Sequence, residues 1–422
     1  SGWGKERVRL KGSLSIKKVM KHIIILGDGM ADEPVPELGG RTPLQAARTP
    51  YMDLLAKKGR SGMLDTVPAG FHPGSEIANL SVLGYDVAQV FEGRGSLEAA
   101  SMGVRLDAGE MAMRCNLICI EDGKIKNHSA GHISTEEATE LMAFLQEKLG
   151  SDRVHFYPGV SYRHLLKIRG GDKRLECTPP HDVPGTAFRD VMVRASAPEA
   201  RGTADLLNDL TLKSQALLAL HPVNLRRIKA GKSPANSIWA WSPGYKPRME
   251  TMGALYGVRN GAVISAVDLI KGIGVYAGLR PIAVEGATGL YDTNYEGKAE
   301  AALEALREGD FVYLHVEASD EAGHEGDVDL KVKTIEHLDG RILKRIYEET
   351  KDWAEPVAIA VLPDHPTPCR LRTHTAAPVP FVIYKPGAEP DGVDAYDEYS
   401  ARAGTYGRLQ GDEFIRAFFG EE

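Results

Sequence analysis

The chain has 422 residues, of which 43% are hydrophobic and 26% are charged, and its formal net charge is -7. This composition is ordinary for a globular protein, and the length favours more than one domain. The acidic balance gives no general attraction to nucleic acid or to acidic membranes, so neither is expected as a partner, and an anionic substrate would need a local basic cluster.

The spacing of the cysteines and the lack of a recognisable targeting signal predict a reducing compartment. The cysteines at positions 115, 119, 177 and 369 give no disulfide framework and no zinc knuckle. No apolar run is long enough for a transmembrane helix, and the first twenty residues lack the apolar core of a secretory signal. These features predict a cytoplasmic protein. Because Met20 precedes the first strong strand, residues 1–19 are interpreted as an N-terminal extension.

The first predicted strand, residues 21–27, is a continuous apolar run that ends at Asp28 between two glycines. An acid flanked by glycines can approach a metal or a phosphate closely, although a turn with an Asx hydrogen bond fits the same pattern. A helix over 49–58 and a strand over 61–67 follow. Ser75 then opens an apolar-periodic helix. Its hydroxyl is placed either to cap this helix or to meet a phosphoryl group at the positive end of the helix dipole.

The pattern changes between residues 111 and 238, where hairpin signals, a long helix over 135–149 and many basic side chains replace the earlier order. This segment is predicted to be an inserted second α/β domain, and residues 20–110 and 239–422 are predicted to form one discontinuous domain around it. The triplet Gly231-Lys232-Ser233 lacks the earlier glycine of a phosphate-binding loop, because Arg226 stands there, so no nucleotide loop is predicted.

Strands and helices alternate again after residue 261. Strands are predicted at 262–266, 281–284, 311–316, 357–362 and 379–384, and helices at 268–277, 295–306, 330–349 and 412–419. This order is typical of a mostly parallel, doubly wound α/β sheet with helices on both faces.

Acidic and imidazole side chains recur just after the predicted strands. Together with the hydroxyl of Ser75, they form the set Asp28, Ser75, Asp320, His324, Asp364, His365 and His374. This set is too large for one cation but suits two that lie about 3.5–4 Å apart. Mixed oxygen and nitrogen donors favour Mn, Zn or Co over Mg or Ca. The alternative interpretation is a group of unrelated caps and turn residues.

Six separated motifs occur in one order along the chain: Gly27-Asp-Gly-Met-Ala-Asp32, Pro73-Gly-Ser-Glu76, Gly93-Arg-Gly-Ser-Leu-Glu-Ala99, Asp320-Glu-Ala-Gly-His324, Asp364-His-Pro-Thr-Pro368 and Thr373-His-Thr375. Together they resemble the cofactor-independent phosphoglycerate mutases of the archaeal type, in the alkaline phosphatase superfamily. The resemblance spans residues 21–420. It implies an alkaline-phosphatase-like fold and the interconversion of 3-phosphoglycerate and 2-phosphoglycerate in glycolysis and gluconeogenesis, through a phosphoserine and without 2,3-bisphosphoglycerate.

The resemblance also implies roles for single residues. Ser75 is similar to the serine that becomes phosphorylated, and Lys298 to the lysine that neutralises the transferring group. Two divalent cations are implied, with Mn²⁺ favoured and Mg²⁺, Zn²⁺ or Co²⁺ as alternatives. The implied ligands are Asp28, Ser75, Asp364 and His365 at one metal and Asp320, His324 and His374 at the other. Substrate-binding residues are expected in the inserted domain at His132, Arg163 and Asp182.

Other functions stay open at this point. A metal-dependent phosphatase, another phosphomutase or a sulfatase of the same superfamily would share the two-metal core. A kinase for a small alcohol such as homoserine and a metal-binding protein without turnover are further alternatives. The expected partner is a small phosphorylated molecule, and a homo-oligomer is left open.

Overall fold

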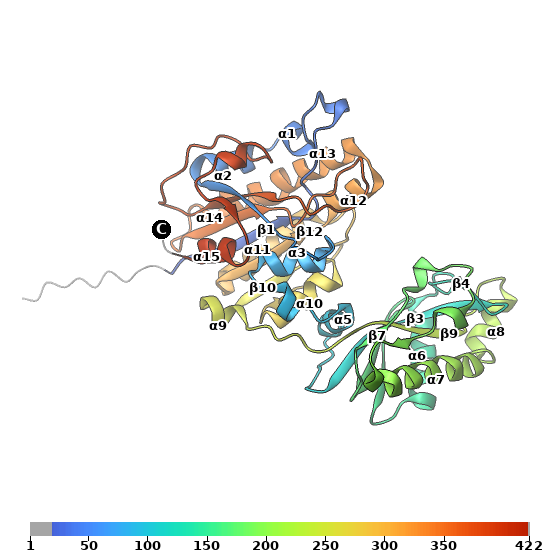
Figure 1. The fold of residues 1–422 in the computed structure, drawn as a ribbon. Coiled ribbons are helices and arrows are strands. Elements are labelled where there is room, and N and C mark those ends of the chain that lie inside the picture. The colour runs from blue at the N-terminus through green and yellow to red at the C-terminus, as the bar shows by residue number, and fades with distance from the viewer. Residues whose placement is uncertain (1–18, 421–422) are drawn as a thin grey trace, which may run out of the picture.

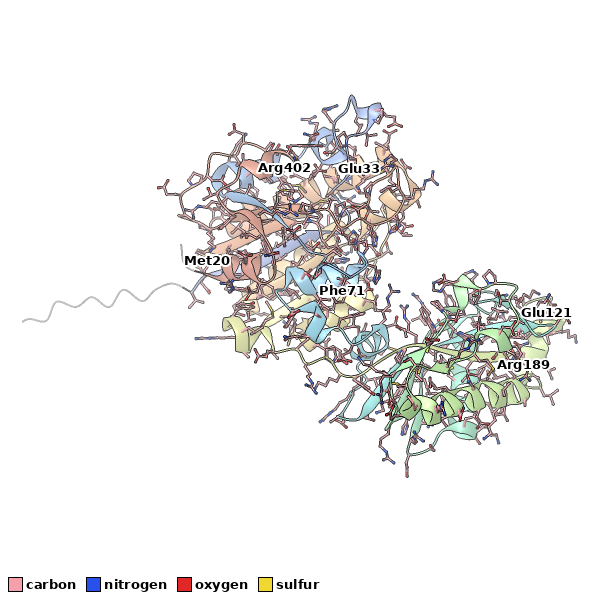
Figure 2. The ribbon with its side chains drawn as sticks, in the orientation of Figure 1. Met20, Glu33, Phe71, Glu121, Arg189 and Arg402 are labelled. Atoms are coloured by element: carbon pink, nitrogen blue, oxygen red, sulfur yellow. The ribbon has the colours of Figure 1, made fainter. Side chains whose placement is uncertain are left out.

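The computed structural model describes residues 19–420, so the predicted N-terminal extension lies almost entirely outside the described residues. Two lobes are visible in Figure 1, and strands β3 (Glu110–Glu121) and β9 (Ser237–Gly244) lead into and out of the second. Figure 2 places Glu33 and Phe71 in the first lobe and Arg189 in the second. No helix within residues 19–420 is long and apolar enough to cross a membrane.

The first lobe is built on a mostly parallel sheet. Within the described residues, its eight strands lie in the order β11-β10-β12-β1-β13-β14-β2-β15. Strand β14 is antiparallel to both of its neighbours, and the other pairs are parallel. In sheet order the bounds are Arg280–Pro281, Gly261–Ile264, Phe311–Val316, Lys21–Gly27, Val357–Leu362, Val379–Tyr384, Arg60–Leu64 and Gly407–Leu409.

Helices cover both faces of this sheet, as the prediction of a doubly wound α/β fold requires. They are α1 (Pro43–Ala46), α2 (Pro50–Lys58), α3 (Ser75–Val82), α4 (Val87–Val90), α5 (Arg94–Ser101), α9 (Met252–Tyr256), α10 (Asp268–Tyr276), α11 (Tyr295–Glu308), α12 (Ala318–Glu325), α13 (Val328–His337), α14 (Lys344–Thr350) and α15 (Glu413–Phe419). Strand β1 shows why both faces are covered. Ile23 and Ile25 belong to one buried cluster, whereas Ile24 and Leu26 belong to the cluster on the opposite face.

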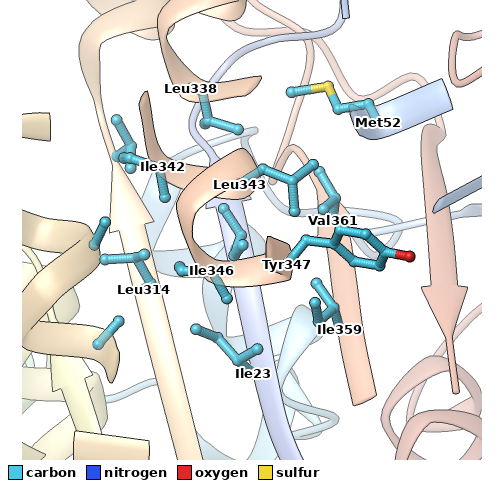
Figure 3. Packing of buried hydrophobic residues seen from close by; sticks show 14 of the residues in the cluster. Ile23, Met52, Leu314, Leu338, Ile342, Leu343, Ile346, Tyr347, Ile359 and Val361 are labelled. Atoms are coloured by element: carbon cyan, nitrogen blue, oxygen red, sulfur yellow. The ribbon is translucent and has the colours of Figure 1, made fainter. Parts of the chain in front are cut away.

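Figure 3 shows the first of these clusters from close by. Ile23, Leu314 and Ile359 come from three neighbouring strands and pack beneath Ile342 and Ile346. All five side chains are at most 1% exposed. Burial on this scale holds the central strands rigid, so groups at their ends are placed accurately.

The second lobe is an α/β unit with a separate, antiparallel sheet. Its strands lie in the order β4-β3-β6-β5, and β9 also pairs with β3, in the antiparallel direction. They are β4 (Lys124–Asn127), β6 (Arg163–Arg169) and β5 (Val154–Val160), beside β3 and β9. The helices of this lobe are α6 (Thr135–Leu149), α7 (Arg201–Leu218) and α8 (Pro222–Lys229), and a small ribbon pairs β7 (Leu175–Glu176) with β8 (Arg194–Ala195).

Most predicted elements coincide with observed ones, and two differ. The predicted helix over 330–349 is divided into α13 and α14 by a π-helical segment, Leu338–Leu343. The predicted strand over 281–284 is reduced to β11, which pairs with β10 alone at the edge of the sheet. Pro281 has no N–H to offer a further strand on the outer side, so β11 stays at the edge, and the N–H of Ile282 still donates to the carbonyl oxygen of Val263 at 2.9 Å.

Helix α5 is wedged between the lobes by two close backbone approaches. A Cβ on Gly95 would lie 2.5 Å from the carbonyl oxygen of Ala112 in β3, and one on Gly272 would lie 2.0 Å from the carbonyl oxygen of Leu97. Only glycine permits both contacts. The helix therefore lies directly against both α10 of the first lobe and β3 of the second.

Acid should destabilise the protein in part through His22 on β1. Its ring packs on Phe418 and Phe419, and burial lowers its pKa to about 4, with a further contribution from Lys385. Between pH 6.5 and 4, His22 is protonated in the unfolded chain but stays neutral in the folded chain. The free energy of unfolding therefore falls as the pH drops through this window. Between about pH 7 and pH 4.5, the free energy of unfolding of the wild type should fall by about 2 kcal/mol more than that of His22→Leu, as measured by urea denaturation. Equal losses in the two proteins would contradict this assignment.

Candidate metal centre

Three adjacent parallel strands deliver the predicted side chains to one edge of the first sheet. Strand β1 lies between β12 and β13 and runs parallel to both. Asp28 follows β1, Asp364 follows β13, and helix α12 with Asp320 follows β12. All three carboxylates are at most 5% exposed. The carboxyl ends of parallel strands share an edge, so residues that lie far apart in the sequence meet here.

The hydroxyl of Ser75 lies against this group. Ser75 is the first residue of α3, and its Oγ is 3.0 Å from Nε2 of His365. The same nitrogen is 3.3 Å from Oδ1 of Asp28 and 3.4 Å from Oδ2 of Asp364. The predicted capping role of Ser75 is wrong, because Gly74 occupies the N-cap position and no side chain caps the helix. The hydroxyl instead points to the acidic and imidazole groups.

A second group forms around Asp320. Its Oδ1 is 3.1 Å from Nε2 of His374, and its Oδ2 is 3.2 Å from Nε2 of His324. The two Nε2 atoms are 2.9 Å apart. Burial acts to raise the pKa of Asp320, but hydrogen bonds from the two histidines outweigh it and hold the pKa below its usual value. The same contact with Asp320 raises the pKa of His324 to about 9.

The histidine tautomers show that a cation fits. Nδ1 of His324 lies 3.1 Å from the carbonyl oxygen of Arg372, and Nδ1 of His374 lies 2.7 Å from that of Pro73. A carbonyl oxygen can only accept, so both Nδ1 atoms carry a hydrogen, and whenever the two rings are neutral their Nε2 lone pairs face each other. Lone pairs at 2.9 Å need a positive charge between them, either a proton or a metal. This is the arrangement that metal-ligating histidines adopt.

The carboxylates point to the same conclusion. Oδ1 of Asp28 is buried and has no hydrogen-bond partner. Burial raises the pKa of Asp28 well above its usual value, and repulsion from Asp320 and Asp364 adds to the effect. An orphaned carboxylate oxygen among other acids is stabilised by a cation. Geometrically, the potential ligand atoms fall into groups within 4.8 Å, which include Asp320 with His365 and His374, and Asp28 with Asp364 and a further histidine, His315.

Sequence reasoning missed His315, which lies in the apolar strand β12 and is fully buried. Its Nε2 is 2.9 Å from Oδ2 of Asp28, and its Nδ1 is 3.0 Å from Oγ of Ser265. Because Ser265 already accepts from the N–H of Val267, its own hydrogen is free for Nδ1, and Nε2–H then donates to Asp28. His315 thus orients Asp28. The only signal in the sequence was a lone imidazole in an otherwise apolar strand.

Removal of His315 should weaken metal binding without removing a predicted ligand. We expect His315→Leu to lower the affinity for Mn²⁺ by about 10–100-fold, the range typical of outer-shell partners of metal ligands. Isothermal titration calorimetry on the purified protein measures this. An unchanged affinity would show that Asp28 is held in place without the imidazole.

Two further side chains surround the group. Asn79 of α3 donates to Oδ2 of Asp364 at 3.0 Å and to the carbonyl oxygen of Ser75 at 2.8 Å, which joins the backbone of Ser75 to the carboxylate. Lys298 of α11 is fully buried and donates to the carbonyl oxygen of His315 at 3.2 Å. Burial lowers the pKa of Lys298 to about 8. Its ammonium therefore lies next to the carboxyl end of β12.

The second lobe holds the remaining predicted residues, and they do not all line the same cavity. Arg163 lines a cavity of about 400 Å³. Asp182 is exposed and lines a neighbouring cavity of about 720 Å³ that also includes Arg94 of the first lobe. His132 is exposed, with its ring 6.1 Å from that of Tyr162, and lines neither of these two cavities.

Sequence reasoning also missed residues beside Arg163 in the smaller cavity. Arg114, Asn116 and His128 line it. Arg114 donates to Glu98 of α5 at 2.6 Å and lies over the ring of Trp241 at 4.7 Å. Glu98 also lines this cavity and pairs with Arg114, so the positive charge that could hold an anion there comes mainly from Arg163.

Comparison with known proteins decides the family. The profile described as 2,3-bisphosphoglycerate-independent phosphoglycerate mutase matches residues 56–224. A protein of Methanosarcina acetivorans with that name is 53% identical over 399 residues, which cover 94% of this chain and 98% of its own. The chain belongs to the 2,3-bisphosphoglycerate-independent phosphoglycerate mutase family. Members of this family are isomerases.

Relatives outside the archaea and solved structures agree with this membership. A Geobacter sulfurreducens protein named as a probable 2,3-bisphosphoglycerate-independent phosphoglycerate mutase is 51% identical, over 91% of this chain and 96% of its own. The cofactor-independent phosphoglycerate mutase of Thermoplasma acidophilum has a TM-score of 0.70 at 26% identity, over 95% of this chain and 99% of its own. The PH0037 protein of Pyrococcus horikoshii has a TM-score of 0.80 at 31% identity, over 96% and 98%. The likeness to these proteins spans both lobes.

Proposed function

We propose that this chain interconverts 3-phosphoglycerate and 2-phosphoglycerate by passing the phosphoryl group through Ser75. The observation that carries the proposal is the position of the Ser75 hydroxyl, 3.0 Å from Nε2 of His365 and beside the carboxylates of Asp28 and Asp364. A serine hydroxyl is a weak nucleophile unless a base or a metal activates it. The ligand set around it supplies the place for such a metal.

The residues that would hold two divalent cations form the two groups described above. Ser75, Asp28, Asp364 and His365 would hold one, and Asp320, His324 and His374 the other. Bound cations would lower the pKa of the serine hydroxyl and neutralise charge on the phosphoryl oxygens. We favour Mn²⁺ because imidazole nitrogens and carboxylate oxygens are mixed in both groups.

Lys298 adds positive charge near the transferring group. The buried ammonium lies at the end of β12, and Glu317 is the acidic side chain that acts most strongly on its pKa. In phosphoryl transfer the protein contributes mainly by positioning and by electrostatic stabilisation. Fixed positive charge around the equatorial oxygens of the phosphoryl group therefore supplies most of the rate enhancement. We assign this role to Lys298.

The second lobe is proposed to bind the rest of the substrate. The cavity lined by Arg114, His128 and Arg163 suits the glycerate carboxylate, because a guanidinium group binds a carboxylate through two parallel hydrogen bonds. His132 and Asp182 remain further candidates. In this proposal the lobe with the parallel sheet is the catalytic domain, and the second lobe closes over it to exclude water.

The chemistry balances without any outside donor. The oxygen of Ser75 forms a bond to phosphorus, the bond from phosphorus to the glycerate oxygen breaks, and the proton that Ser75 gives up is matched by the one that glycerate gains. The glycerate then reorients, and its neighbouring hydroxyl takes the phosphoryl group back and returns the proton. Two displacements at one phosphorus predict net retention of configuration.

The proposed setting follows from the substrate. Interconversion of the two phosphoglycerates serves glycolysis and gluconeogenesis, which places the protein in the cytoplasm with phosphorylated small molecules as its partners. No separate 2,3-bisphosphoglycerate is needed, because Ser75 carries the phosphoryl group during the reaction.

Incubation with 3-phosphoglycerate and Mn²⁺ tests the proposal. Phosphorus NMR should show 2-phosphoglycerate approaching an equilibrium ratio, with no ATP present. Release of inorganic phosphate as the sole product would make the chain a phosphatase instead, and an absolute requirement for ATP would make it a kinase.

A further inference from the structure

Lys331 is a fully buried lysine on α13 that is not among the proposed ligands. Its ammonium donates to the carbonyl oxygen of Ala31 at 3.0 Å, to Oδ2 of Asp32 at 3.0 Å and to the carbonyl oxygen of Thr367 at 2.9 Å. An ammonium has three hydrogens, so all of them are used. A lysine is almost never fully buried unless its charge is paired, and here Asp32 pairs it.

The three acceptors belong to two loops that carry proposed metal ligands. Ala31 and Asp32 follow Asp28 after β1, and Thr367 follows His365 after β13. The backbone N–H of Thr367 also donates to the carbonyl oxygen of Ala31 at 3.1 Å. A single ammonium therefore joins the ends of two adjacent strands at the edge where the metals would bind.

The third ligand-bearing segment is tied to the same point. The hydroxyl of Thr367 donates to Oδ1 of Asp320 at 2.6 Å, so the loop that Lys331 holds also orients a carboxylate on α12. On the far side, Asp32 accepts from the N–H of Cys369 at 3.1 Å, and its own N–H donates to the buried carboxylate of Glu398 at 3.0 Å. Asp32, the charged partner of the ammonium, is thus itself held on its far side by the backbone of Cys369 and by Glu398.

We propose that Lys331 is a positioning residue for the metal centre, which holds the loops of Asp28 and of Asp364–His365 at the separation that two cations require. Repulsion between the buried carboxylates acts to spread these loops, and Lys331 opposes this spreading through the backbone instead of through the ligands. The inference rests on the metal centre of the proposed function, and the experiment below separates the two.

The test is Mn²⁺ binding to the full chain by isothermal titration calorimetry. Lys331→Met removes the ammonium and keeps most of the side-chain volume. The matched control is Lys21→Met, because Lys21 is also a buried lysine that donates to carbonyl oxygens, those of Leu306 and Arg307, but lies at the opposite end of β1. Both variants lose a buried ammonium and should melt at lower temperature without metal. Only Lys331→Met should bind Mn²⁺ about tenfold or more weakly than the wild type.

A second variant keeps the inference testable if Lys331→Met fails to fold. The double variant Lys331→Met with Asp32→Asn removes the carboxylate that would otherwise be left buried without its partner. It should also bind Mn²⁺ more weakly, because the carbonyl oxygens of Ala31 and Thr367 still lack their donor.

Each outcome decides one of the two ideas. If the wild type binds Mn²⁺ and the variants at Lys331 bind it equally well, the positioning role is wrong and the metal centre stands. Equal weakening in Lys21→Met would show a general loss of stability and would also overturn the inference. If the wild type binds no divalent cation, the proposed metal centre itself is wrong.

Discussion

Replacing Ser75 with alanine should abolish isomerisation. The hydroxyl is the sole group placed to carry the phosphoryl group in the proposed reaction, and removal of a nucleophile costs roughly 10⁴-fold or more in rate. The fold should survive, since the Ser75 side chain makes no capping hydrogen bond. The wild type mixed with 3-phosphoglycerate and Mn²⁺ should carry a phosphoryl group on the peptide that contains Ser75, detected by mass spectrometry, and Ser75→Ala should carry none.

Ser81→Ala is the matched control for this experiment. Ser81 lies near the other end of the same helix, Ser75–Val82, and is 5% exposed. Its replacement should leave turnover within about twofold of the wild type, since a substitution away from the reacting groups changes little. Isomerisation by Ser75→Ala at a rate near that of Ser81→Ala would rule out a phosphoserine at this position.

Asp28→Asn should have opposite effects with and without metal. Burial and the neighbouring acids raise the pKa of Asp28, so the charged carboxylate is unfavourable where no cation balances it. Asparagine keeps the shape and can still accept the hydrogen bond from His315. Without metal, the variant should therefore be more stable than the wild type, with a free energy of unfolding about 1–2 kcal/mol higher at neutral pH.

With metal, the same substitution should be severe. A neutral amide does not balance the charge of a cation, and the site formed with Ser75, Asp364 and His365 would keep a single carboxylate. Turnover should therefore fall by roughly 10³-fold or more. Addition of Mn²⁺ should raise the melting temperature of the wild type and leave that of Asp28→Asn nearly unchanged. Glu33→Gln, at a partly exposed residue of the same loop region, is the control. If Mn²⁺ protects Asp28→Asn as fully as the wild type, Asp28 is not a ligand.

The parts of the site that the sequence predicted well are those that follow from the order of strands. Asp28, Asp320 and Asp364 could be grouped because each follows an apolar run, and parallel strands end at one edge. His315 could not be found in the same way, because both faces of a central strand are buried and the pattern does not show which side chain turns toward the edge. Lys331 reads in the sequence as part of a solvated helix face, and its partners lie in loops that only the fold brings near.

The second lobe was harder to predict for a different reason. Its strands are antiparallel and pair with register shifts in β3, so the sequence does not show which basic side chains share a face. Arg163, predicted to bind substrate, lines a cavity, whereas Arg114, which lines the same cavity, was missed. His132 and Asp182 were chosen for their chemistry, and Asp182 lines the neighbouring cavity while the ring of His132 lies beside that of Tyr162.

The placement of β1 also constrains how the chain can be made. Its two neighbours are β12 and β13, so the run Ile23-Ile24-Ile25-Leu26 has no partner strand until Phe311 has left the ribosome. The segment from Glu110 to Gly244 is contiguous and can complete its own sheet while β1 is still unpaired. During that interval an aggregation-prone hydrophobic strand stays unpaired, and shielding by chaperones would matter most there.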